Sequence, residues 1–548
     1  MTTTADRPPA PTPAAAGSLT HRQILVILSG LLLGMFLAAL DQTIVSTAIR
    51  TIADKLNGQT QQAWVTTAYL ITSTISTPLY GKLSDSYGRK PFYLFAIGIF
   101  LVGSLLCGTA TGIYQLAAYR AIQGIGAGGL MSLAFAIVGD IVPPRERGRY
   151  QAYFMSVFGT SSVLGPVLGG ALAGQDRLLG FDGWRWIFYV NVPIALAAFA
   201  VVSKQLHLPA RRSSHKIDFV GAALLTAAVV PVLLLAEKGR EYGWSSATSL
   251  TLMAVGVLAL VSFVPWEARM GEAAILPLRI FKNSVFNISS IVALLVGTAM
   301  FGALVGLPLY LQIVKGESPT KAGLLLIPLM VGIIICSGIT GRIMMRTGKY
   351  KIFPVFGTAV MFVAVLLFST LTVDSPLWHA CAFMVIMGAG LGLSMQTLVI
   401  SVQNALPPQD MGVATSSVTF FRSMGGTFGA AVALSVLFGS VGGNIVDRAR
   451  AAKLPQAVID RFGEASSLND TSIIRTLPPQ IQRVVLQGFA DSMHTSFLTV
   501  AFLLVPAFVL TLFIKEIPLR SSGGIAAAQA DAETEERLSA ARAESAVV

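Results

Sequence analysis

Charged residues are scarce in this chain of 548 residues. Only 12% are Asp, Glu, Lys or Arg, whereas soluble domains carry about 25%. Hydrophobic residues make up 54% of the chain, and the mean hydropathy is +0.69. This composition excludes an ordinary soluble domain and predicts a protein that is embedded in a membrane.

Cysteine is also scarce, and the motifs of common enzymes are missing. Cys107, Cys336 and Cys381 all lie in apolar runs, at spacings that fit neither a disulfide framework nor a metal site. No GxxxxGK[ST] segment is present to hold a nucleotide phosphate, and no set of residues supports a nucleophilic triad. We therefore expect no enzyme activity, no metal and no cofactor.

Apolar runs of about 20 residues recur along the chain, each long enough to cross a hydrocarbon layer of ~30 Å. They predict an all-α polytopic membrane protein with fourteen spanning helices. The expected spans are 24–48, 63–81, 92–111, 114–140, 150–174, 186–203, 217–236, 248–266, 284–313, 320–341, 352–371, 377–403, 412–440 and 495–515.

Basic residues gather in every second loop, which predicts the topology. If the N-terminus is inside, the inner loops hold many Lys and Arg residues and the outer loops far fewer; the inner ones include Lys82, Arg89, Lys90, Arg145, Arg147, Arg149, Arg342 and Arg346. This asymmetry places both termini in the cytoplasm of a cell (inner) membrane. The net charge of +12 thus reflects membrane topology, and no nucleic-acid partner is expected.

The order of spans and loops predicts the domain organisation. We expect a disordered cytoplasmic leader, a first six-helix half, a linker with two inserted helices, a second six-helix half and a cytoplasmic tail, at 1–20, 21–204, 205–283, 284–518 and 519–548. A long outer segment, 441–494, is expected to be helical, either lying on the outer face or extending the last two spans. The segments 81–90 and 341–351 form a weak internal repeat, as in transporters built from two related halves.

Asp41 and Arg120 are charged residues inside apolar runs. A charged Asp at the centre of a spanning helix is unfavourable by about 2.5–3.5 kcal/mol, so such a group faces a wet cavity with a partner or carries a proton. The alternative for Asp41 is an interfacial position near the outer end of its helix. Arg120 needs an anion or a water path, unless it snorkels to the outer surface.

The loop GKLSDSYGRK at 81–90 has the most specific pattern in the chain. Gly81 and Gly88 allow close approach and unusual backbone angles. Asp85 is placed to cap or face a helix N-terminus, and Arg89 has Asp140, at the inner end of the fourth span, as its available carboxylate partner. The alternative is a tight basic loop with no further role.

This loop resembles the signature loop of the major facilitator superfamily. With fourteen spans, the chain resembles the drug:proton antiporters of the quaternary-ammonium and multidrug efflux branch. Five other segments resemble motifs of that branch; they are LDQTIV at 40–45, RAIQGIG at 120–126, GPVLGG at 165–170, WRWIF with NVP at 184–193, and 412–429 with its Phe-Arg and Gly-Gly pairs. The resemblance covers 24 to about 515 and names no substrate.

The resemblance implies a fold and a function. The fold would be two six-helix halves plus two inserted helices, and the function would be multidrug efflux in exchange for protons, the proton being the coupling ion. Asp41 and Arg120 would couple to the proton. Gly81, Asp85, Gly88, Arg89 and Asp140 would form a latch on the cytoplasmic face, with Asp140 in a structural role.

The resemblance also implies roles for helix five and for a substrate cavity. Gly165 and Pro166 would bend helix five, since proline lacks an N–H, while Gly169 and Gly170 would let another helix approach; a plain packing kink is the alternative. Candidate cavity residues for an amphipathic substrate are Gln42, Tyr69, Gln123, Phe301, Tyr310, Gln312, Gln396, Asn404, Phe420, Phe421 and Arg422.

Asp41 is the one deep acid in the expected spans. Between 284 and 440 the acids are Glu317, Asp374 and Asp410, all in loops. One proton site suits neutral or zwitterionic lipophiles better than cations, because one-for-one exchange with a monovalent cation is electroneutral.

Three other interpretations stay open. The chain could export an endogenous lipid, siderophore or natural product, with 441–494 handing the cargo to an envelope partner. It could be an importer, which the GPVLGG segment argues against, or a sensor that transports nothing. Membrane lipids are expected neighbours in every case.

Overall fold

The computed structural model describes residues 21–58, 61–206, 218–243, 245–455, 474 and 477–519. Helices dominate this part of the chain. They are α1 (His21–Lys55), α2 (Ala63–Tyr87), α3 (Arg89–Thr109), α4 (Ile113–Ile141), α5 (Pro144–Ala173), α6 (Trp186–Tyr189), α7 (Asn191–Gln205), α8 (Phe219–Tyr242), α9 (Ala247–Met270), α10 (Ser284–Leu309), α11 (Pro319–Leu324), α12 (Ile327–Thr347), α13 (Ile352–Ser369), α14 (Leu377–Ala405), α15 (Met411–Ala451) and α17 (Pro479–Leu512).

Thirteen helical stretches among the described residues are long and apolar enough to cross a membrane. α2 is the fourteenth membrane helix; it is rich in Thr and Ser but packs against α4 and α15 inside the bundle. The predicted all-α polytopic fold is thus confirmed. The expected span 320–341 is divided into α11 and α12, and α10 ends in a π-helical turn, Tyr310–Val314.

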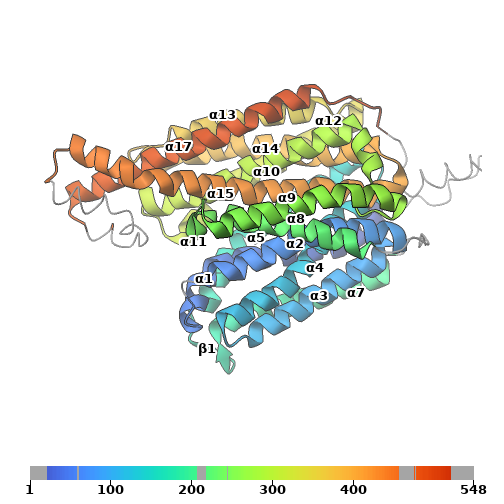
Figure 1. Ribbon diagram of the computed structural model, residues 1–548, viewed down its shortest axis with the longest axis horizontal. Helices are drawn as coiled ribbons and strands as arrows, with labels where there is room; N and C mark the ends of the chain where they lie inside the picture. The colour runs from blue at the N-terminus through green and yellow to red at the C-terminus, as the bar shows by residue number, and fades with distance from the viewer. Residues whose placement is uncertain are drawn as a thin grey trace, which may run out of the picture.

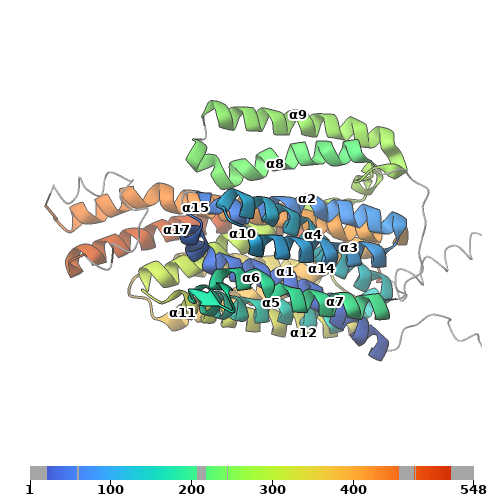
Figure 2. The same cartoon turned by 90° about the horizontal axis from the view of Figure 1, so that it is seen from below.

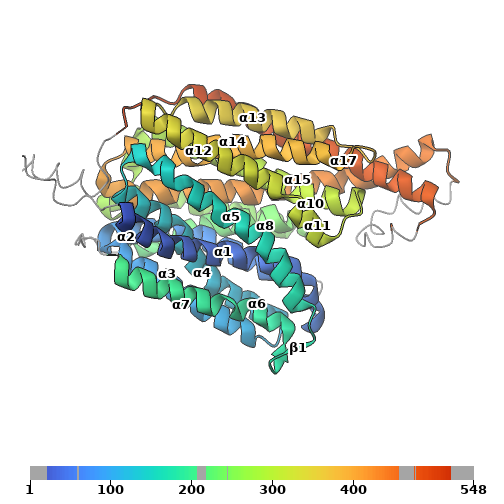
Figure 3. The same cartoon turned by 180° about the vertical axis from the view of Figure 1, so that it is seen from behind.

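Two six-helix halves lie side by side (Figure 1). The first half comprises α1 to α7, in which α2 and α3 pack on α4, and α1 packs on α5 and α7. The second comprises α10 to α17, in which α10 and α17 pack on α15, and α12 and α13 pack on α14. The halves meet where α5 contacts α12, as Figure 3 shows, and where α2 contacts α15.

The inserted helices α8 and α9 stand on one side of the bundle (Figure 2). α8 contacts α2 and α15, whereas α9 packs mainly on α8. Asp218 caps α8 by accepting from the backbone N–H of Gly221 at 2.7 Å, and it also accepts from the indole N–H of Trp266 at 2.9 Å. The outer face of α9 exposes Leu258 and Val261 among other apolar side chains, as expected for a helix that faces lipid.

The bundle has two ends that differ in structure. We call the end with Gly88, Val142 and the loop 406–410 the motif end. We call the other end, which carries the antiparallel strands β1 (Arg177–Leu178) and β2 (Phe181–Asp182), the hairpin end. Near β1, Lys55 Nζ donates to Asp176 at 2.9 Å, and this hydrogen bond holds the pKa of Asp176 below its usual range.

The segment 441–494 extends the last two spans, which was one of the two expected arrangements. α15 continues to Ala451 and α17 begins at Pro479, so both helices project beyond the hairpin end (Figure 1). Residues 456–473 of this segment lie outside the described residues, as do the expected leader 1–20 and nearly all of the tail 519–548.

Glycines set the close contact between α10 and α15. A Cβ on Gly429 would lie 1.9 Å from the carbonyl oxygen of Thr298, whereas a Cβ on Gly439 of the same helix would have no neighbour within 4 Å. We expect Gly429→Ala to lower the stability by about 1–3 kcal/mol, because the two backbones would have to separate. The measurement is the thermal midpoint in detergent. Gly439→Ala is the matched control and should be neutral or slightly stabilising; equal midpoints would contradict this account.

Candidate functional site

Asp41 and Arg120 form a buried ion pair in the first half. Asp41 is 0% exposed and Arg120 is 1% exposed. The Arg120 guanidinium donates from Nη1 to Asp41 Oδ2, and its Nε donates to the carbonyl of Val65 at 3.3 Å. Arg120 therefore does not snorkel to the surface. Asp41 is buried inside the protein together with its cationic partner.

Three polar side chains complete this cluster around Asp41. Asp41 Oδ1 accepts from Gln123 Nε2 and from Asn191 Nδ2, each at 2.8 Å. Gln123 Oε1 also accepts from Arg120 Nη1 at 2.6 Å, and Gln123 Nε2 donates to Ser104 Oγ at 2.6 Å. The cluster thus joins α1, α3, α4 and α7, which lie far apart in the sequence.

Tyr69 of α2 closes the cluster from the other side. Its ring centroid lies 4.0 Å from the Arg120 Cζ atom, a cation–π geometry, and its hydroxyl donates to the carbonyl of Ala38 at 3.3 Å. Tyr69 and Gln123 were predicted as cavity residues, but here they contact the ion pair. Asn191 had been noted only within a motif, and nothing in the sequence pointed to Ser104.

The chemistry of the cluster depends on which groups donate. Arg120, Gln123 and Asn191 all donate to Asp41, so this arrangement stabilises the ionised carboxylate. Oδ2 accepts from Arg120, and Oδ1 accepts from Gln123 and Asn191, so the carboxylate ties α1 to α4 and α7. The cluster is therefore sensitive to any shift of α4 or α7 relative to α1.

A second buried ionic cluster lies at the motif end. Arg89 donates from Nε to Asp140 Oδ2 at 2.7 Å, which is the pairing predicted from the sequence, and its Nη2 lies 2.6 Å from Asp85 Oδ1. Arg89 Nη1 donates to Ser84 Oγ at 2.6 Å. Gly88 separates α2 from α3 with φ 99°, a conformation that favours glycine.

Asp85 connects this cluster to the other half of the molecule. Its two carboxylate oxygens accept from the backbone N–H groups of Gly412, at 3.0 Å, and Val413, at 2.8 Å, at the start of α15. A carboxylate in this position also interacts favourably with the helix dipole. A Cβ on Gly81 would lie 2.0 Å from Ser416 Oγ, so only glycine lets α2 and α15 approach this closely.

Arg147 makes another connection between the halves at the motif end. It donates to the carbonyls of Val142, at 2.8 Å, and Gly139, at 2.5 Å, and to Gln403 Oε1 of α14. Gln403 Nε2 in turn donates to Thr415 of α15 at 2.8 Å. The sequence identified Arg147 only as one of several basic loop residues, so this contact was missed.

Burial is continuous around the motif ends of three central helices. Every residue of 132–140 in α4, 396–404 in α14 and 411–420 in α15 is buried, whereas 421–424 are all partly exposed. Gly425, Gly426 and Gly429 beyond them are buried again, so α15 is covered on all sides up to Phe420 and only partly covered further along. We call the three buried stretches the motif-end plug.

The GPVLGG segment of α5 lies next to Asp41. A Cβ on Gly165 would be 2.2 Å from Thr43 Oγ1, and one on Gly169 would be 2.8 Å from the carbonyl oxygen of Ile44. Pro166 lies within a continuous α5 and faces Gly323 of α11 in the other half. A Cβ on Gly170 would have no neighbour within 4 Å among the described residues, so close helix approach depends on Gly165 and Gly169.

The remaining predicted cavity residues are dispersed. Tyr310 donates to the carbonyl of Thr372 at 2.9 Å, and Asn404 donates to the carbonyls of Ile517, at 3.2 Å, and Pro518, at 3.1 Å, so both hold backbone segments in place. Phe301 packs on Gly426 of α15, and Gln396 and Phe420 belong to the motif-end plug, with Phe421 and Arg422 directly beyond it. Gln312 lies in the π-helical turn, and Gln42 follows Asp41 in the sequence.

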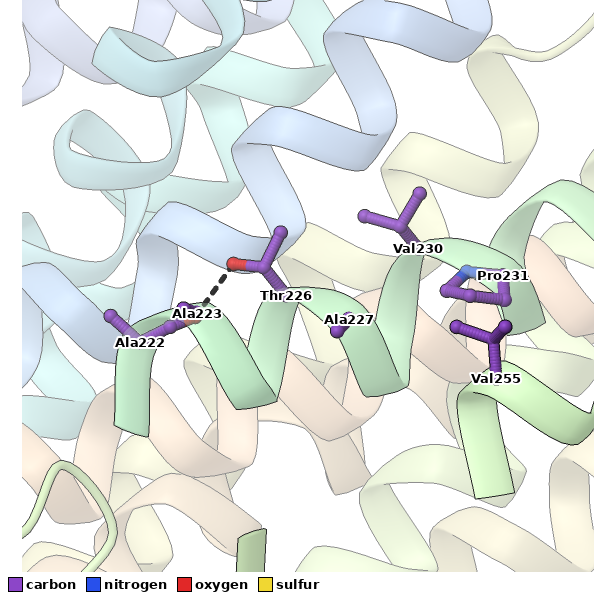
Figure 4. Close-up of a pocket in the computed structure, with 7 residues that line it drawn as sticks. All are labelled: Ala222, Ala223, Thr226, Ala227, Val230, Pro231 and Val255. Carbon is purple, nitrogen blue, oxygen red and sulfur yellow. Dashed lines mark hydrogen bonds between the residues drawn. The ribbon is translucent and has the colours of Figure 1, made fainter. Parts of the chain in front are cut away.

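A separate apolar hollow lies on the inserted helices (Figure 4). It is lined by Ala222, Ala223, Thr226, Ala227, Val230, Pro231 and Val255. The Thr226 hydroxyl donates to the carbonyl of Ala222 at 2.7 Å, so this side chain offers little to a polar ligand. All of its lining residues lie on α8 and α9, and none of the predicted site residues is among them.

Known proteins resemble this chain over most of its length. Two transporters of Bacillus subtilis, multidrug transporter protein MdtP and multidrug resistance protein 3, are 34% and 35% identical to it. The first match covers 92% of this chain and 95% of MdtP, and the second covers 87% and 91%. An uncharacterized MFS-type transporter of Mycobacterium tuberculosis is 38% identical over 93% of this chain and 72% of its own length.

A solved structure supports the fold independently of sequence. The proton:xylose symporter XylE, bound to 6-bromo-6-deoxy-D-glucose, superposes with a TM-score of 0.59 at 14% identity, covering 91% of this chain and 97% of its own. The family model described as Major Facilitator Superfamily matches residues 31–430. The arrangement of two six-helix halves and these matches identify the chain as a membrane transport protein of the major facilitator superfamily.

Proposed function

We propose that the protein is a proton-coupled antiporter that exports small amphipathic or lipophilic compounds across the cytoplasmic membrane. The observation that carries this proposal is the buried Asp41–Arg120 pair, which is also contacted by Gln123 of α4, Asn191 of α7 and Tyr69 of α2. An ion pair buried this deeply in a membrane helix bundle is a candidate proton relay. The multidrug names of the relatives from Bacillus subtilis support the export of drugs.

The proposed cycle uses the two clusters in turn. A proton from outside binds Asp41 when α1 and α4 have moved apart, and Arg120 then loses its carboxylate partner. The proton leaves towards the cytoplasm when the pair forms again. Asp85, Arg89 and Asp140 hold the motif end closed while the cavity faces outwards, through the contact of Asp85 with Gly412 and Val413. In this proposal the motif end is cytoplasmic, as are both termini.

The test is flux of a lipophilic dye in proteoliposomes under an imposed pH gradient. We expect the dye to accumulate on the acidic side, because inward movement of protons drives outward movement of the substrate. Adding an ionophore that collapses the gradient should stop accumulation within the same vesicles. Accumulation that ignores the gradient, with protein that is folded, would contradict proton coupling.

A dedicated exporter of an endogenous product is the second candidate. The projections of α15 and α17 beyond the hairpin end favour it, because they offer an exposed surface to an envelope partner; Arg448 and Asp491, which pair at 2.6 Å across the two helices, are both partly exposed there. Removing 441–494, which takes away both projections, would then spare dye efflux but abolish export of the native product.

A further inference from the structure

Arg422 lies in the middle of the second half. It is eleven residues from the start of α15 at Met411, and at 1.5 Å per residue this is about 16 Å from the motif end. The hydrocarbon layer is ~30 Å thick, so Arg422 sits near its midplane. A cation at this depth needs an anion, a water-filled space or both.

The structure supplies no anion to Arg422. Among the described residues, its guanidinium makes no hydrogen bond and no ion pair. Other buried arginines have acceptors: Arg120 binds Asp41, Arg89 binds Asp85 and Asp140, and Arg147 donates to Gln403 and to two backbone carbonyls. Between 284 and 440 the acids are the loop residues Glu317, Asp374 and Asp410, which pair with Lys321, Arg483 and Arg279.

Arg422 lies just beyond the point where the complete burial of α15 ends. The ten residues before 421 are all buried, and Arg422 itself is partly exposed, directly beyond the motif-end plug. Its backbone is fixed against α10, since a Cβ on Gly297 would lie 2.2 Å from the Arg422 carbonyl oxygen. The Phe421 ring adjoins it in the sequence, and the Phe301 ring packs on Gly426 one turn further along. Arg422, which has no acidic partner among the described residues, therefore lies directly beyond the plug, with Phe421 beside it in the sequence and Phe301 packed one turn further along α15.

This environment matches an amphipathic anion. Arginine binds carboxylate, sulfonate and phosphate groups with two parallel hydrogen bonds, and the aromatic rings can contact an apolar body. We infer that Arg422 is the recognition site for the acidic group of the transported compound, and that the substrate class is amphipathic organic anions. The inference rests on the proposed function and gives it a substrate class.

Charge movement in the proposed cycle is consistent with this class. Exporting a monovalent anion while importing one proton moves two elementary charges in the direction that the membrane potential favours. Exchange of a neutral compound moves one charge, and exchange of a monovalent cation moves none. A carrier with the single deep acid Asp41 thus uses the membrane potential most fully with an anionic substrate.

Two dyes that differ in one sulfonate test the inference. N-phenyl-1-naphthylamine is neutral, and 1-anilinonaphthalene-8-sulfonate has the same ring system with a sulfonate added. Uptake into inside-out vesicles, or proteoliposomes of that orientation, would be compared for the full-length chain and for Arg422→Gln. We expect Arg422→Gln to reduce transport of the sulfonate by tenfold or more, while transport of the neutral dye changes less than twofold.

Two further variants keep this result interpretable. Arg422→Lys retains a positive charge without the paired geometry and should restore part of the sulfonate transport. Arg483→Gln removes an exposed arginine that pairs with Asp374 at the hairpin end, and should affect neither dye. Equal losses for both dyes in Arg422→Gln, or transport of the neutral dye alone by the natural chain, would overturn the inference.

Binding of the two dyes separates this inference from the proposed function. Quenching of tryptophan fluorescence measures binding in detergent without any gradient. If the natural chain binds the sulfonate at least tenfold more tightly than Arg422→Gln but moves neither dye under a pH gradient, the proposed antiport fails and the anion site stands. If it pumps the neutral dye and does not bind the sulfonate, the anion site fails and the proposed antiport stands.

Discussion

Asp41→Asn should abolish accumulation of substrate against its gradient while leaving a folded protein. One proton crossing about 100 mV and one pH unit can sustain a substrate gradient on the order of a hundredfold for a neutral compound. We expect this ratio for the natural chain and a ratio near one for the variant. The measurement is the steady-state distribution of a neutral dye across proteoliposomes.

The geometry of the cluster explains why asparagine cannot replace Asp41. Asparagine has nearly the same shape and can still accept from Gln123 and Asn191, so the local packing should persist. It cannot take up a proton, and it leaves Arg120 without a carboxylate in a buried position. Removing one member of a buried ion pair destabilises a protein by about 3–5 kcal/mol, so stability has to be followed together with transport.

Two variants separate lost coupling from lost folding. Asp41→Asn combined with Arg120→Gln removes both charges, and should regain stability without regaining accumulation. Asp176→Asn removes an exposed acid that pairs with Lys55, and should leave accumulation unchanged. If Asp41→Asn still accumulated the dye, coupling would lie elsewhere, and Asp140 would be the next acid to test.

Asp85→Ala should open the motif end. Asp85 accepts two backbone hydrogen bonds from α15 and contacts Arg89. Hydrogen bonds that involve a charged group contribute about 1.5–3 kcal/mol each. Losing even one of them should increase the population with an open motif end by roughly ten- to a hundredfold, since 1.4 kcal/mol corresponds to a factor of ten.

A cysteine at Ser416 can report this opening. Ser416 is buried and lies against Gly81, so it should be protected while α2 and α15 are in contact. In a background with Cys107, Cys336 and Cys381 replaced by serine, a membrane-impermeant thiol reagent applied from the motif-end side should label Ser416→Cys faster when Asp85→Ala is present.

The controls for the latch use the same reporter. Asp85→Asn keeps an acceptor for the backbone N–H groups and should give an intermediate labelling rate. Asp374→Asn breaks an exposed pair with Arg483 at the opposite end and should not alter labelling. Unchanged labelling with Asp85→Ala would show that the closure of the motif end does not depend on this carboxylate.

Local features of the sequence were sufficient for the architecture. Apolar runs of membrane length predict helices, because the backbone must satisfy its own hydrogen bonds inside lipid. These runs predicted fourteen spans, with two helices inserted between the halves. The glycine at the start of the loop 81–90 predicted the close approach at Gly81. The cost of burying a charge also singled out Asp41 and Arg120, since that cost depends on local hydrophobicity and not on the fold. Gly170 departs from the expected close approach, because a Cβ there would meet no other helix among the described residues.

Only the tertiary structure decided which partners meet. The sequence indicated that Asp85 can face a helix N-terminus, but Gly412 is more than 300 residues away, and no local rule selects that helix. Asn191 reaches Asp41 because α7 packs on α1, Ser104 reaches Gln123 because α3 packs on α4, and Arg147 reaches Gln403 where α5 contacts α14. Arg422 has the opposite outcome, since no acid in the described part of the chain pairs with it. The sequence determined which charged residues lie inside apolar runs, where burying a charge in the membrane is unfavourable. The packing of the helices determined which of these charged residues have a partner of opposite charge.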